Sequence, residues 1–192
     1  MLNIETLLRI PDVDTLAVFD LSPDGQRLAF AWNKSGDWQI YELNLPANLP
    51  TLAPGASAGV TKYQFTDLPI TTGPGGKLAP RYSPNGKFLA YALDLDGSES
   101  YHIILCDLAS GEARDLTPNI EFTIQPVFAW SPDSRQIAYL ADKTGNFDLY
   151  LLTLDSPPSL GKSPEANSDR LFFSPGGPAH FVRWSPDGSH IA

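Results

Sequence analysis

A four-residue turn motif, Ser-Pro-Asp/Asn-Gly/Ser, occurs four times along the chain. In each copy an apolar pair, Leu-Ala or Ile-Ala, follows at the sixth and seventh positions after the serine. Self-similarity at a spacing of tens of residues indicates a repeat architecture, in which each unit needs neighbours to bury its faces. The four copies are Ser22-Pro23-Asp24-Gly25, Ser83-Pro84-Asn85-Gly86, Ser131-Pro132-Asp133-Ser134 and Ser185-Pro186-Asp187-Gly188.

Each repeat has the local chemistry of short antiparallel strands. Within the motif, proline fixes one backbone angle, aspartate bonds to nearby backbone, and glycine accepts positive φ, so the motif predicts a tight turn. Strand patterns follow at residues 26–32, 88–93 and 136–141. After each of these comes a polar turn containing Gly36, Gly97 or Gly145, and then a strand that begins at an aromatic residue. This order predicts a hairpin in every copy.

Four short antiparallel strands in a unit of about 40–60 residues are typical of a β-propeller blade. The predicted fold is therefore all-β: a partial propeller with about three four-stranded blades and the start of a fourth. An open β-meander is the alternative, and residues 3–10 carry one helical signal. We predict a single incomplete domain over residues 1–192, with blade 1 at about 15–68, blade 2 at about 77–118, blade 3 at about 124–174 and the start of blade 4 at about 179–192.

Composition limits the classes of partner. The net charge of −9 argues against nucleic acid, whose affinity comes largely from Lys and Arg on phosphates. No apolar run approaches the ~20 residues that cross a bilayer, so no membrane partner is expected. The single cysteine, Cys106, excludes an internal disulfide, and we expect it to be buried. With no signal-peptide pattern at the N-terminus, we expect a cytoplasmic protein.

The motif and the Leu/Ile-Ala-Phe/Tyr strand that follows it resemble the TolB-like, WD-type propeller repeat. Three further stretches, 8–14, 91–101 and 111–118, are similar to the N-terminal propeller of serine peptidases of the prolyl oligopeptidase family. The acylaminoacyl-peptidase and dipeptidyl-aminopeptidase branch is the one that they resemble.

This resemblance implies a role without catalysis. In that family the propeller caps a C-terminal α/β-hydrolase domain, which holds a Ser-Asp-His triad, and restricts access to short or unstructured peptides. The implied partners in the parent protein are that hydrolase domain and peptides. The alternative is a TolB-like interaction propeller with no attached enzyme. Open blade edges also lead us to expect self-association of the chain.

Candidate catalytic residues are few. Residues 55–59 satisfy G-x-S-x-G around Ser57, but a proline-rich loop precedes them where a nucleophile elbow needs a buried strand. The histidines, His102, His180 and His190, have neither triad nor zinc spacing. We therefore predict no catalytic residue, no metal site and no cofactor, and we assign no substrate-binding residue.

Acidic residues gather in the turns between the second and third strands. Asp94, Asp96 and Glu99 resemble half of a calcium loop, but the other copies place Asn33/Gly36 and Asp142/Gly145 at the same offsets as Asp94/Gly97, which favours a structural turn. Such turns project from one face of a propeller. We hypothesise a negative face that attracts positively charged peptide ends, and a solvated rim without a ligand is the alternative. The face contains Asp37, Asp94, Asp96, Glu99, Asp142 and Asp148, against Lys34 and Lys143.

Overall fold

The computed structural model describes residues 19–45, 64–65, 68–118, 121–154, 168–177 and 179–192. All regular elements in these ranges are strands, and they form three four-stranded antiparallel sheets in chain order. The helical signal at residues 3–10 lies outside the described residues. The prediction of an all-β partial propeller is confirmed.

The strands of each sheet run in sequence order from one edge to the other. The first sheet consists of β1 (Phe19–Leu21), β2 (Arg27–Trp32), β3 (Gln39–Asn44) and β4 (Gln64–Phe65). The second consists of β5 (Gly76–Tyr82), β6 (Phe88–Asp94), β7 (His102–Asp107) and β8 (Ala113–Asp115). The third consists of β9 (Ile124–Trp130), β10 (Gln136–Ala141), β11 (Asp148–Thr153) and β12 (Ser168–Phe173).

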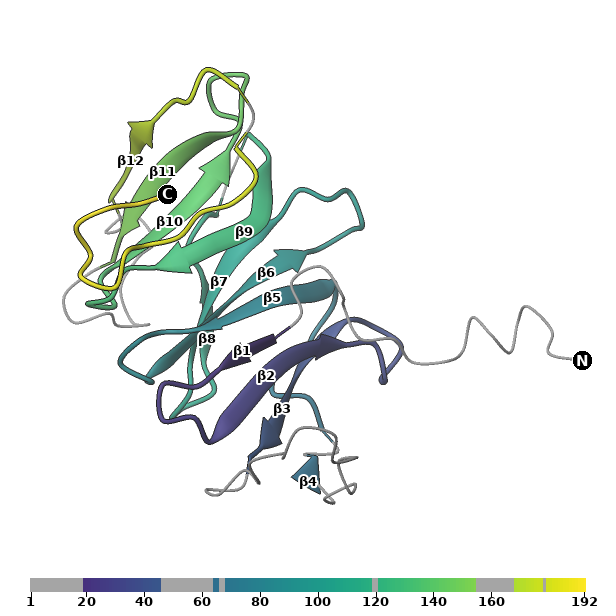
Figure 1. The fold of residues 1–192 in the computed structure, drawn as a ribbon. Helices are drawn as coiled ribbons and strands as arrows, with labels where there is room; N and C mark the ends of the chain where they lie inside the picture. The colour runs from purple at the N-terminus through teal and green to yellow at the C-terminus, as the bar shows by residue number, and fades with distance from the viewer. Residues whose placement is uncertain (1–18, 46–63, 66–67, 119–120, 155–167, 178) are drawn as a thin grey trace, which may run out of the picture.

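The sheets are arranged as a fan (Figure 1), from β1–β4 at the bottom of the view to β9–β12 at the upper left. Strand β5 contacts both β1 and β9, the first strands of the neighbouring sheets. The first strands therefore lie on the inner side of the fan. This is the radial arrangement of successive propeller blades.

Small residues on one sheet face make room for aromatic residues on the next. Ala29 and Ala31 of the first sheet are fully buried and pack in one cluster with Tyr91 of the second. In the same way Ala90 of the second sheet shares a cluster with Tyr139 of the third. Because side chains alternate along a strand, Tyr91 faces the first sheet and its neighbour Ala90 faces the third. The two clusters between sheets hold most of the buried apolar residues, and each large apolar side chain buried there contributes roughly 1.5–3 kcal/mol.

The fourth copy of the motif begins a further hairpin. Arg183 and Ala192 exchange two backbone hydrogen bonds, of 2.8 and 2.9 Å. Trp184 and Ile191 form a bridge and pack with buried Val182 against the third sheet. The predicted start of a fourth blade is present.

The motif turns of neighbouring sheets contact one another. A β-carbon built on Gly188 would lie 3.6 Å from Cδ of Pro132, and one built on Gly86 would lie 4.0 Å from Cδ of Pro23. In the third copy a serine replaces this glycine: Ser134 has φ 61°, and its Oγ accepts a 3.0 Å hydrogen bond from the backbone N–H of Asn85. The motif therefore joins blades as well as turning the chain.

Each motif turn is also closed internally. The serine hydroxyl donates to the side chain two residues later, at 2.6 Å for Ser185 and Asp187 and at 2.8 Å for Ser83 and Asn85. The bonds from Ser185 and Ser189 stabilise the charged carboxylate and lower the pKa of Asp187 to about 2. Because Asn85 makes the same bonds without a charge, the turn depends on the acceptor oxygen and not on ionisation.

Ser134 allows the contact between two motif turns to be measured. Ser134→Ala is expected to destabilise the protein by about 1–2 kcal/mol, because it removes the hydrogen bond and leaves the strain at positive φ unchanged. Ser134→Gly loses the same bond but removes the backbone strain, and should be about 1 kcal/mol more stable than the alanine variant. Urea denaturation of both variants measures the difference. Equal stabilities would show that the positive φ costs nothing here.

Candidate binding face

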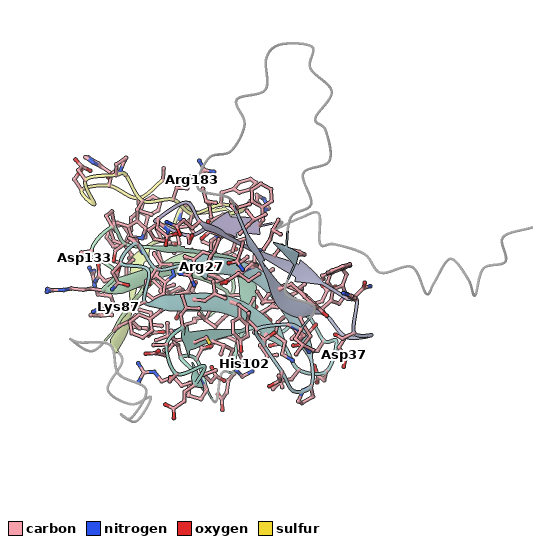
Figure 2. The ribbon with its side chains drawn as sticks, turned by 90° about the horizontal axis from the view of Figure 1, so that it is seen from below. Arg27, Asp37, Lys87, His102, Asp133 and Arg183 are labelled. Carbon is pink, nitrogen blue, oxygen red and sulfur yellow. The ribbon has the colours of Figure 1, made fainter. Side chains whose placement is uncertain are left out.

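The turns that follow β2, β6 and β10 lie at the opposite end of the sheets from the motif turns. Figure 2 shows Lys87 and Asp133, beside and in motif turns, at one end, with Asp37 and His102 towards the other. Asp37, Asp96 and Glu99 are exposed there. The end that carries the β2–β3, β6–β7 and β10–β11 turns is called the turn face below.

Two carboxylates on the turn face accept hydrogen bonds from backbone N–H groups. Asp94 accepts hydrogen bonds from the N–H groups of Gly97, at 2.8 Å, and Glu99, at 3.3 Å. Asp142 accepts one from the N–H of Thr123 at 2.6 Å. The Asp94 bonds are those of a structural turn, the interpretation favoured by the repeat pattern, whereas the Asp142 bond joins the end of β10 to the segment before β9. Within the described ranges no three His, Cys, Asp or Glu side chains are grouped to hold a metal ion.

Asp148 corrects the predicted composition of this face. Its side chain is 1% exposed, and its carboxylate accepts hydrogen bonds from the hydroxyls of Thr144 and, at 2.7 Å, Ser174. As the first residue of β11, it points towards the segment that leaves the third sheet. Assigning it to the exposed negative surface was therefore wrong.

The first residue of the third strand in each sheet binds the segment that follows that strand. Gln39 donates from Nε2 to the carbonyl of Gly73 at 3.1 Å and accepts from the hydroxyl of Thr71 at 2.8 Å. His102 contacts Asp115 at 2.6 Å, between Nδ1 and Oδ2. Gln39 thus binds the segment that leaves the first sheet, and His102 binds the last residue of β8 in the second. His102 therefore has a structural role.

A buried lysine secures the connection between the first two sheets. Lys77 is 1% exposed, and its ammonium donates to the carbonyls of Gly73, Pro74 and Gly75 at 2.5, 2.8 and 2.9 Å. Burial lowers the pKa of Lys77, and the nearby charge of Asp37 opposes this. Sequence reasoning missed this lysine, because no pattern in the chain shows that three carbonyls converge on it.

A pocket of about 540 Å³ opens on the turn face between the second and third sheets. Its walls combine two carboxylates and two hydroxyls with an aromatic ring and an ammonium group. Such a lining suits a small polar or charged group. The lining residues are Ser100, Glu121, Phe122, Thr123, Asp142 and Lys143.

The described residues place one serine hydroxyl against a histidine ring, at the end of the chain. Ser189 Oγ lies 2.6 Å from Nδ1 of His190 and donates to Asp187 at 2.7 Å. In a catalytic triad the acid orients the histidine, whereas here the acid binds the serine of an exposed turn. His180 is exposed, and Ser57 lies outside the described residues.

Comparisons with known proteins place the fold. No protein-family profile matches the chain. TolB from Acinetobacter baumannii superposes with a TM-score of 0.62 at 18% identity, over 91% of this chain and 36% of that one. The chain has the fold of a TolB-like propeller. A puromycin-hydrolyzing peptidase from Mycobacterium tuberculosis matches with a TM-score of 0.53 at 14% identity, over 81% of this chain and 21% of that one.

A curated relative of the chain in sequence is named as a peptidase. Dipeptidyl-peptidase 5 of Porphyromonas gingivalis is 29% identical over 140 residues, which is 71% of this chain and 19% of the relative. The chain thus spans about a fifth of that relative's length. The resemblance to TolB-like propellers and to peptidase propellers, inferred from the motif and from residues 8–14, 91–101 and 111–118, is confirmed. Across the described ranges, no helix is long and apolar enough to cross a bilayer.

Proposed function

We propose that this chain is a non-catalytic N-terminal propeller segment of a serine peptidase of the prolyl oligopeptidase family. It packs on a C-terminal α/β-hydrolase domain of the parent protein and limits which peptides reach that domain. The observation that carries this proposal is the 29% identity to Dipeptidyl-peptidase 5 over 140 residues. A cytoplasmic location and the acylaminoacyl-peptidase and dipeptidyl-aminopeptidase branch belong to the same proposal.

The chemistry of the described residues supports a scaffold role. The buried polar side chains Gln39, Lys77 and Asp148 all hold connections between strands or sheets. Exposed apolar side chains on β1 and β12 offer surfaces for packing against the hydrolase domain or another copy of the chain. Size-exclusion chromatography measures whether the chain packs against another copy of itself. These side chains are Phe19, Leu21, Leu171, Phe172 and Phe173.

The purified chain is expected to hydrolyse neither dipeptidyl nor acyl-aminoacyl p-nitroanilide reporters above the rate without protein. Ser57→Ala should leave that result unchanged, since we assign Ser57 no nucleophilic role. The positive test lies in the coding sequence after Ala192. A G-x-S-x-G between a predicted strand and helix, with Asp and His downstream, is expected there. Reporter hydrolysis that disappears in Ser57→Ala would overturn the proposal.

The second candidate is a TolB-like interaction propeller with no attached enzyme. The superposition on TolB over 91% of this chain favours it at the level of the fold. It predicts further blades and then a stop codon in the same coding sequence, without a nucleophile elbow. That outcome would replace the peptidase proposal.

A further inference from the structure

An ammonium group on the turn face is surrounded by aromatic rings. Lys143 Nζ lies 4.3 Å from the ring centroid of Phe122, 4.6 Å from that of Tyr150 and 5.6 Å from that of Tyr139. The carboxylate of Asp169 contacts the same ammonium and also accepts a hydrogen bond from the hydroxyl of Tyr139. The faces of aromatic rings attract cations, and a carboxylate adds charge. We call Phe122, Tyr139, Tyr150 and Asp169 the ammonium cage.

The cage is assembled from parts of the chain that are far apart in sequence. Phe122 precedes β9, Tyr139 lies on β10, Tyr150 lies opposite it on β11, and Asp169 comes from β12. Tyr139 and Tyr150 are 96% or more buried, so the walls of the cage are fixed by packing of the third sheet. The side chain of Lys143 is 20% exposed and that of Asp169 33%, so the cage is open to solvent on one side.

The blade fold does not require this arrangement. Lys143 stands twelve residues after the motif serine, and the same position holds Lys34 in the first copy and Leu95 in the second. Lys34 lies 5.1 Å from the ring centroid of Trp32, whereas Leu95 is 52% exposed. The second sheet therefore forms with an apolar side chain at this position. A lysine at this position is therefore not a requirement of the blade fold.

The cage adjoins the pocket of about 540 Å³, because Phe122 and Lys143 line the pocket as well. The carboxylates of Glu121 and Asp142 lie on the other walls. Because Asp169 already pairs with the charge of Lys143, these two carboxylates give the pocket a negative charge, which favours a positively charged ligand. It also gives the flexible lysine side chain a space to occupy when it leaves the rings.

We propose that the ammonium cage is a binding site for organic ammonium groups, and that Lys143 occupies it as an internal ligand. An incoming alkylammonium, such as a peptide amino terminus, takes the place of Lys143 over the rings and against Asp169. The displaced side chain moves into the adjoining pocket. This site does not depend on the peptidase proposal, since it concerns binding by the chain itself.

Removing the internal ligand should expose the site. In Lys143→Ala, tetramethylammonium chloride is expected to bind with a dissociation constant in the millimolar range, at least tenfold tighter than in the wild type. Aromatic ring signals in NMR spectra, recorded at constant ionic strength, report the binding. Titration with the neutral isostere 3,3-dimethylbutanol should give no saturable shift of the ring signals. In the double variant that carries Phe122→Ala and Lys143→Ala, tetramethylammonium should bind at least tenfold more weakly than in Lys143→Ala. Lys87→Ala removes an equal charge at the other end of the sheets and should bind like the wild type.

Circular dichroism and thermal melting show whether Lys143→Ala keeps its fold. The proposal fails if the folded variant binds tetramethylammonium no more tightly than the wild type does. It also fails if the variant binds the neutral isostere as tightly as tetramethylammonium. If Lys143→Ala does not fold, the proposal is tested by titrating the wild-type protein. High tetramethylammonium concentrations should then shift the ring signals of Phe122, Tyr139 and Tyr150 in a saturable way. Absence of those shifts would equally overturn it.

Discussion

Gly75→Ala is expected to destabilise the protein by about 3–5 kcal/mol, through overpacking and backbone strain together. Gly75 has φ +80°, and a β-carbon on it would lie 2.4 Å from the carbonyl oxygen of Asp94 and 2.9 Å from Cα of Leu95. Both of those atoms belong to backbone, so no side chain can swing away to relieve the clash. The segment joining the first and second sheets must then move away from the end of β6.

Gly97→Ala is the matched control for this prediction. Gly97 has φ +81°, and a β-carbon on it would meet nothing within 4 Å. Its replacement should cost only the backbone term, about 1–2 kcal/mol. Denaturant unfolding of both variants gives the difference in the free energy of unfolding, which measures the close approach alone. Equal losses in the two variants would mean that the Gly75 segment yields without cost.

Lys77→Met should destabilise the protein by about 3 kcal/mol or more, although methionine has a similar length and is apolar. The change removes three hydrogen bonds from an ammonium and leaves the carbonyls of Gly73, Pro74 and Gly75 without that donor. Hydrogen bonds from a charged donor contribute about 1.5–3 kcal/mol each, and the carbonyl of Gly73 keeps its bond from Nε2 of Gln39. The loss is expected in the free energy of unfolding, together with faster amide exchange in the segment around Gly73.

Lys87→Met provides the comparison for Lys77→Met. Lys87 is exposed beside a motif turn, and its substitution makes the same chemical change without burial. Its effect should stay within about 0.5 kcal/mol, as for most surface substitutions. If both variants lost equal stability, the role of the buried ammonium in joining the sheets would be refuted.

Strands and turns formed by local chemistry were predictable. The motif turns, the hairpins that follow them and the burial of Cys106 depend on residues close in sequence or on simple apolar patterns. Strand β5 was harder to predict, because it contains Pro80 and also Ala79 at φ 52°. Its register with β6 shifts between Leu78 and Arg81. Proline and positive φ are unusual within a strand, and here an irregularity in the ladder accommodates them.

Polar side chains at the sheet ends were predicted less well. Asp148 has the composition of an exposed turn residue, but its hydroxyl partners are Thr144 and Ser174, the latter twenty-six residues away. A pattern of charges cannot distinguish a solvated carboxylate from one that ties two segments together. Burial decides between them, and burial depends on where the next segment of chain runs.

The sequence alone determined the repeat, the antiparallel hairpins and the propeller class, because turn chemistry and strand alternation act over a few residues. Tertiary structure alone decided which polar groups are buried and which side chains meet. The rings around Lys143 come together only when the segments that carry them pack, and Gln39 and Gly73, thirty-four residues apart, meet only in the folded chain. The physical reason is that desolvation and cation–aromatic attraction act through space, between residues whose separation along the chain gives no sign of their contact.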